Sequence, residues 1–174
     1  MTPDGDPLIL TAALDAETFA RLDGLRRAHF PPERNFLDAH LTMFHALPGA
    51  HLREIVERLV AVAARTPPLP LRIAEVRFLG RGVAYGIEGP ALKALRAGLA
   101  EGWSGWLNRQ DAQGWRPHVT VQNKVPGEAA RALHARLSAG FEPRAATATG
   151  LSLWHYRGGP WEAAADVAFG ADAG

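Results

Sequence analysis

Apolar and polar residues alternate with two different periods along the chain, and this pattern predicts a mixed α and β protein. Residues 8–14 form a short apolar run of strand length. Asp15 can cap a helix that we expect to end near His29, because apolar residues recur there at helical spacing. A proline-containing and charged loop at residues 31–35 then leads to a second short strand at residues 40–46.

The rest of the first half predicts one more helix and a hairpin. An amphipathic helix is expected from Pro48 to about Arg65, and the proline-rich residues 66–70 end it. The sequence then predicts two strands, at residues 71–79 and 83–87, around a glycine-containing turn.

The second half repeats this order of elements. We expect a helix at 90–108, a loop at 111–117, a strand at 118–124, a helix at 126–139 and a closing hairpin of 149–156 and 162–169. The chain is therefore predicted to be one domain over residues 1–174. Its two lobes, at about 8–88 and 89–169, can exchange strands. The expected class is α+β with pseudo-two-fold symmetry, in which two antiparallel sheets line a central groove and helices lie outside.

A short motif occurs once in each half and supports this duplication. His40-Leu-Thr-Met-Phe-His-Ala-Leu-Pro-Gly49 and His118-Val-Thr-Val-Gln-Asn-Lys-Val-Pro-Gly127 both follow the pattern His-x-Thr-x-x-x-x-(Leu/Val)-Pro-Gly. A single His-x-Thr carries little information, but two copies with the same aliphatic positions and the same ending are improbable by chance. The alternative to a functional role is a duplication that kept two strands with a purely structural role.

The two motif strands are predicted to share one arrangement of side chains. Successive side chains of a strand point to opposite faces. The polar faces then carry two sets of residues: His40, Thr42 and Phe44 in the first strand, and His118, Thr120 and Gln122 in the second. By the same alternation, His45 is expected to point away from His40.

Two histidines in one groove form an acid and base pair. Imidazole changes charge near neutral pH, so one ring can accept a proton while the other donates one. The hydroxyls of Thr42 and Thr120 can donate to phosphoryl oxygens. Metal catalysis is the rival interpretation, but the sequence has no His-Glu-x-x-His and no carboxylate beside either motif. We therefore expect no metal and no cofactor.

Composition limits the class of ligand and the setting. The chain has 174 residues, 47% of them hydrophobic, and a net charge of +1. So small a charge argues against a long polyanion on a basic surface and favours a small or terminal phosphate. The absence of cysteine excludes disulfides and thiolate metal sites. No signal peptide or apolar stretch of membrane-spanning length is evident, so we expect a cytoplasmic protein with no membrane contact and no obligate protein partner.

The paired motifs resemble those of the 2H phosphoesterase superfamily, which includes 2'-5' RNA ligase-like proteins and cyclic phosphodiesterases. The segment Leu151-Ser-Leu-Trp-His-Tyr-Arg-Gly-Gly-Pro-Trp-Glu162 is similar to one in bacterial members. The resemblance covers most of the chain, roughly residues 8–169. It implies a bilobal fold with the motifs lining a groove. It also implies metal-independent hydrolysis of a 2',3'-cyclic phosphate or a 2'-5' phosphodiester in RNA or a nucleotide, with His40, Thr42, His118 and Thr120 as catalytic residues.

A nucleotide or RNA-terminal phosphate also needs contacts outside the reacting group. Aromatic faces can stack on a base, and arginine can bind a phosphate. Our candidates for substrate binding are Phe44, Arg116, Gln122, Trp154 and Tyr156. Trp161 is a further aromatic candidate. Three alternatives stay open: a non-catalytic RNA-end or nucleotide-binding protein of the same fold, a 2'-5' RNA ligase, and a purely structural domain.

Overall fold

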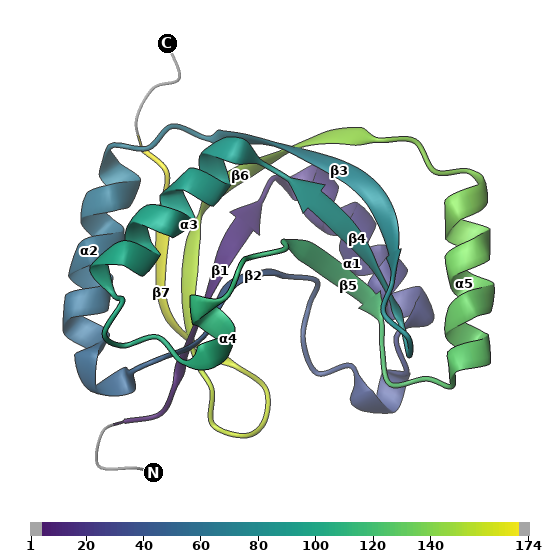
Figure 1. Ribbon diagram of the computed structural model, residues 1–174, viewed down its shortest axis with the longest axis horizontal. Coiled ribbons are helices and arrows are strands. Elements are labelled where there is room, and N and C mark those ends of the chain that lie inside the picture. Colours follow the sequence, from purple (N-terminus) through teal and green to yellow (C-terminus); the bar gives the residue numbers. More distant parts are fainter. Residues whose placement is uncertain (1–4, 171–174) are drawn as a thin grey trace.

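The computed structural model describes residues 5–170 and contains one seven-stranded sheet with helices packed outside it (Figure 1). The strands are β1 (Leu8–Leu14), β2 (Leu41–Leu47), β3 (Leu69–Phe78), β4 (Val83–Glu88), β5 (His118–Gln122), β6 (Arg144–His155) and β7 (Glu162–Ala168). The α-helices are α1 (Ala16–His29), α2 (Leu52–Ala64), α3 (Pro90–Gly102), α4 (Arg109–Ala112) and α5 (Gly127–Ala139). Two 3-10 turns, η1 (Pro32–Arg34) and η2 (Gly49–His51), complete them.

Local sequence explains most of these boundaries. Asp15 caps α1 as expected, since its carboxylate accepts the Thr18 backbone N–H at 2.9 Å. Strand β5 ends before Lys124, because this residue adopts φ 63° and leaves the extended conformation. The short helix α4 extends into the first two residues of the segment expected to be a loop, and Asn108 caps this helix by accepting the Asp111 N–H at 2.8 Å.

All strand pairs are antiparallel, in the order β2-β1-β6-β3-β4-β5, and β7 pairs with β6. The long strand β6 joins the two ends of the molecule. Its first part, up to Ala148, pairs with β3, and its second part, from Gly150, pairs with β7. The predicted α+β class and antiparallel pairing are confirmed. The two sheets that we expected are parts of one sheet, because β6 belongs to both.

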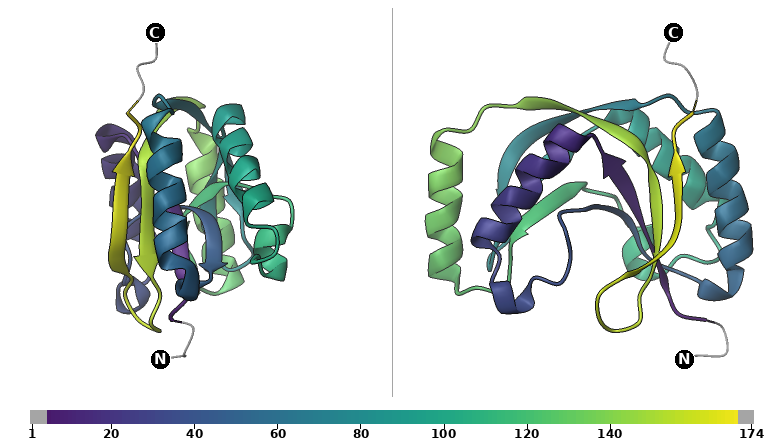
Figure 2. Two further views of the ribbon diagram at one scale, coloured as in Figure 1. Left: turned by 90° about the vertical axis from the view of Figure 1, so that its left-hand side faces the viewer. Right: turned by 180° about the vertical axis from the view of Figure 1, so that it is seen from behind.

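Helices cover the outside of the arched sheet. Figure 1 shows α2 and α3 at one end and α1 and α5 toward the other, and Figure 2 shows β7 beside β6 next to α2. Helix α1, from the first half of the chain, packs on β5 from the second half. The division into lobes at residues 8–88 and 89–169 therefore stays a prediction. None of the helices within residues 5–170 is long and apolar enough to cross a membrane.

The two end strands of the sheet, β2 and β5, approach each other under the arch (Figure 1). Their aliphatic residues, such as Leu41, Met43, Val119 and Val121, are fully buried in the core. This packing orients the remaining side chains of both strands toward a common space. The fold thus brings the two copies of the motif together.

Candidate active site

The two motif histidines have the same hydrogen bond. Nδ1 of His40 lies 2.7 Å from the carbonyl oxygen of Asp38, and Nδ1 of His118 lies 2.9 Å from that of Arg116. A carbonyl can only accept, so each Nδ1 carries a hydrogen and each neutral ring keeps its lone pair on Nε2. The repeat in sequence is therefore a repeat in geometry, down to the tautomer.

All four predicted catalytic residues line one groove. Its volume is about 420 Å³, and its walls include His40, Thr42, His118 and Thr120. Arg116, another predicted site residue, also lines it. The groove that both imidazoles line therefore has room for a ligand of phosphate size or larger.

The environment of His40 favours its neutral form. Burial lowers the pKa of His40 to about 4, and the Asp38 carbonyl opposes this shift only in part. The positive charge of Arg26 lowers the pKa of His40 further. Without an anion in the groove, the His40 ring is neutral at pH 7 and can accept a proton at Nε2.

The pKa of His118 is also lowered. Burial is the main cause, the Arg116 carbonyl opposes it, and the charge of Arg77 adds to it. Both motif histidines are thus held in the neutral form in the free protein, which is the form that can accept a proton. An anion bound between them raises their pKa values, because it stabilises an imidazolium.

Two buried arginines hold the motif strands in place. Arg26 of α1 donates from Nη1 to the Thr120 carbonyl at 3.0 Å, and from Nε to the Leu37 carbonyl at 3.0 Å. Arg96 of α3 donates from Nε to the Met43 carbonyl at 2.9 Å. Each arginine comes from one half of the chain and holds the motif strand of the other. These bonds offset the cost of burying the guanidinium charges.

Both motif strands bulge directly after the threonine. Strand β1 pairs Leu10 with Phe44 but Thr11 with Thr42, so the residue between Thr42 and Phe44 is extra in the ladder. The same shift occurs in β5, where Val83 pairs with Gln122 and Ala84 with Thr120.

The bulges overturn three expectations that assumed regular alternation. Phe44 is 0% exposed and packs under the Arg96 guanidinium, so its expected role in substrate binding is wrong. Gln122 is also buried and does not line the groove; among the described residues its Oε1 has no hydrogen-bond partner. His45, which we expected to point away from His40, lines the groove beside it.

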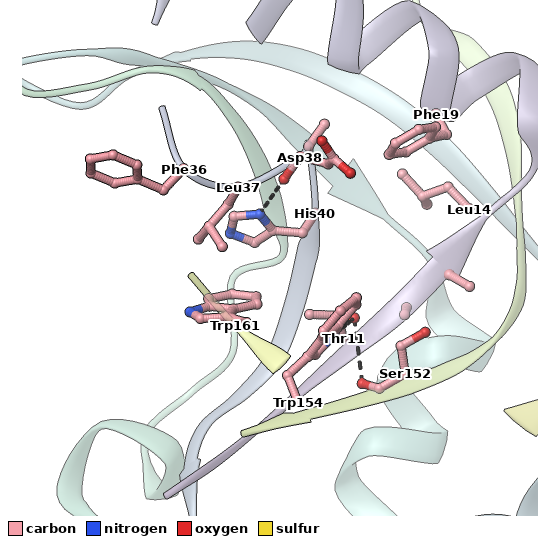
Figure 3. Close-up of a pocket in the computed structure, with 13 residues that line it drawn as sticks. Thr11, Leu14, Phe19, Phe36, Leu37, Asp38, His40, Ser152, Trp154 and Trp161 are labelled. Carbon is pink, nitrogen blue, oxygen red and sulfur yellow. Dashed lines mark hydrogen bonds between the residues drawn. The ribbon is translucent and has the colours of Figure 1, made fainter. Parts of the chain in front are cut away.

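A second cavity of about 440 Å³ adjoins the groove and has aromatic walls (Figure 3). Trp154 lies in its wall, and its Nε1 donates to Thr11 Oγ1 at 3.0 Å. Trp161 lines both cavities, with its ring centroid 4.7 Å from that of His40. The predicted residue Tyr156 lines neither cavity and is 45% exposed.

The sequence signals for His45 and Trp161 differ. Trp161 follows the glycines of the closing hairpin, and an aromatic residue at an exposed hairpin tip is a sign of a contact surface. His45 gave no such sign, since only the bulge turns it to the groove. Within residues 5–170, no three His, Cys, Asp or Glu side chains are placed to hold a metal ion.

Two His-x-Thr strands that face one groove of an antiparallel α+β fold define the 2H phosphoesterase class. The chain belongs to the 2'-5' RNA ligase superfamily, whose family model matches residues 14–160. No curated protein sequence matches it significantly.

Solved structures show the same fold. The crystal structure of TT0787 of Thermus thermophilus is similar with a TM-score of 0.66 and 16% identity, over 95% of this chain and 98% of that chain. E. coli LigT complexed with 3'-AMP is similar with a TM-score of 0.62 and 20% identity, over 95% and 99%. LigT complexed with NADP+ has a TM-score of 0.59 and 19% identity, over 95% and 99%.

Proposed function

We propose that this protein is a metal-independent phosphoesterase that hydrolyses a 2',3'-cyclic phosphate or a 2'-5' phosphodiester of RNA or a nucleotide. One observation carries the proposal: His40 and His118 line one groove with matching hydrogen bonds at Nδ1, and each has a threonine two residues along the strand that lines the same groove. A structural strand pair has no need for two such imidazoles. Membership of the superfamily supports the same class of chemistry.

The reaction uses the two histidines in opposite protonation states. One neutral imidazole takes a proton from water as the water oxygen bonds to phosphorus. The other, as imidazolium, gives its proton to the 2' or 3' oxygen as the bond from that oxygen to phosphorus breaks. Thr42 and Thr120 donate to the non-bridging oxygens, where negative charge increases in the transition state.

Substrate binding favours the protonation of one of the two histidines. In the free protein, burial lowers the pKa values of His40 and His118, so both rings are neutral at pH 7. A bound phosphodiester brings a negative charge into the groove and raises the pKa of an adjacent imidazole. Activity then requires that one ring is protonated while the other is neutral, so we expect a bell-shaped pH profile.

The aromatic cavity beside His40 is the proposed site for the base or ribose. Trp154, Trp161 and Phe36 offer flat apolar faces there (Figure 3). Such faces stack on bases with little sequence preference. The solved complexes of E. coli LigT contain 3'-AMP, ATP and NADP+, so that protein of similar fold binds nucleotides.

Hydrolysis of 2',3'-cyclic AMP and a 2'-5' dinucleotide, with EDTA present, tests the proposal. We expect turnover by the wild type and near-complete loss in His40→Ala and in His118→Ala. The double variant should be little worse than either single one, because the two groups act as a unit. Nucleotide binding by the wild type without turnover of any phosphoester would favour the non-catalytic binder, and joining of RNA ends would favour the ligase.

A further inference from the structure

A third imidazole lines the groove in addition to the two motif histidines. The His45 side chain is 41% exposed and lies in the same wall as His40, Thr42 and His118. His45 and the two motif histidines line the same groove. The two proton transfers of the proposed reaction do not use it.

A buried carboxylate holds His45. The Asp111 side chain is 0% exposed, and its Oδ1 lies 3.0 Å from His45 Nδ1. Both Asp111 oxygens accept the His45 backbone N–H, at 2.8 and 2.9 Å, and Oδ2 accepts the Ala46 N–H at 2.9 Å. The Asp111 carbonyl accepts Arg96 Nη2 at 2.8 Å. Donors of β2 therefore hold both carboxylate oxygens, and Arg96 holds the main chain of Asp111.

This carboxylate is charged. Burial by itself would raise the pKa of Asp111, but the hydrogen bonds from the side chain and backbone of His45 and from the Ala46 N–H outweigh it and lower the pKa. Because a carboxylate accepts hydrogen bonds, His45 Nδ1 carries a hydrogen and Nε2 is the ring nitrogen left for a ligand. A ring that donates from both nitrogens is an imidazolium, and the Asp111 carboxylate beside Nδ1 lies where it stabilises that cation.

The three groove histidines therefore differ in their partners. His40 and His118 donate to neutral carbonyls, whereas His45 donates to a charged carboxylate. The second motif has Asn123 at the position of His45, and Asn123 does not line the groove. The pseudo-symmetry of the two motifs is broken at this point, and only the first motif carries the additional group.

We propose that His45, positioned by Asp111, binds the phosphoryl group of the substrate by donating from Nε2 to a non-bridging oxygen. This leaves His40 and His118 for proton transfer and places the phosphoryl oxygens toward the first motif. The groove walls also include Arg96 and Arg116, so the surroundings favour an anion. The inference rests on the proposed function for the identity of the substrate. Its test does not depend on that function, because binding of inorganic phosphate needs no turnover.

Two substitutions separate the two ring nitrogens of His45. In His45→Asn the amide can replace Nδ1 beside Asp111 but cannot reach the groove. In His45→Gln the amide reaches as far as Nε2 and can donate to an anion. Calorimetric titration with inorganic phosphate should show affinity about tenfold weaker in His45→Asn, and within about threefold of the wild type in His45→Gln. Asn123→Ala, at the matching position of the second motif, should bind phosphate as the wild type does.

A measurement on the wild type guards against misfolding of a variant. Nitrogen NMR of the imidazoles should show a shift of the His45 Nε2 resonance on addition of phosphate. An unshifted resonance, no phosphate binding by the wild type, or wild-type affinity in a folded His45→Asn protein would each overturn the inference. Failure of the proposed function gives a different result: the wild type would turn over no phosphoester, yet its phosphate binding would still depend on His45.

Discussion

The low pKa of His40 makes the stability of the protein depend on pH. The pKa is about 4 in the folded protein against an ordinary value of 6.5. Between these two values the unfolded chain binds a proton that the folded protein does not, so stability falls as the pH falls through this window. Above pH 6.5 neither state binds the proton at this site, and its contribution to the pH dependence vanishes.

Replacing His40 should remove this part of the acid sensitivity. The two pKa values imply a loss of about 2 kcal/mol at pH 5 relative to pH 8. In His40→Asn the side-chain amide can still donate to the Asp38 carbonyl, but no group titrates there. We therefore expect the free energy of unfolding to fall by about 2 kcal/mol less between pH 8 and pH 5 in the variant than in the wild type.

Urea unfolding of both proteins at the two pH values gives this difference directly. Comparing each protein with itself cancels any packing lost through the substitution. NMR titration of the His40 ring in the wild type provides an independent value. If the wild type and His40→Asn lose the same stability between pH 8 and pH 5, then His40 is not held neutral by burial. The account of its neutral state in the free protein would then be wrong.

Three further predictions concern the threonines, the aromatic cavity and a buried arginine. Thr42→Val and Thr120→Val should each lower kcat/KM in steady-state kinetics. The loss should correspond to no more than about 3 kcal/mol of activation free energy, as expected for one transition-state hydrogen bond. Trp154→Ala should raise KM for a cyclic nucleotide by a factor that corresponds to about 1 kcal/mol or more of binding free energy, whereas Tyr156→Ala should leave KM unchanged. If Trp154→Ala and the wild type have equal KM values, the base binds elsewhere. Arg26→Met should reduce the free energy of unfolding by about 3 kcal/mol in urea titration, because buried carbonyls lose a charged donor.

Local features of the sequence predicted the elements and the central pair of the site. The capping carboxylate of Asp15 and the spacing of apolar residues define α1 through bonds within a few residues. The two His-x-Thr motifs with their aliphatic neighbours indicated two strands that bury one face, and the structure brings His40 and His118 to one groove. These are short-range properties, since strand alternation and helix capping depend on neighbouring residues alone.

Tertiary structure decided the rest, because it depends on how distant strands pair. The bulges in β2 and β5 form only where these strands meet β1 and β4, and they bury Phe44 and Gln122 while turning His45 to the groove. One inserted residue reverses every later side chain of a strand, and no periodicity within the motif reveals it. The same holds for Asp111, which lies far from His45 in sequence and meets it only through the short helix α4.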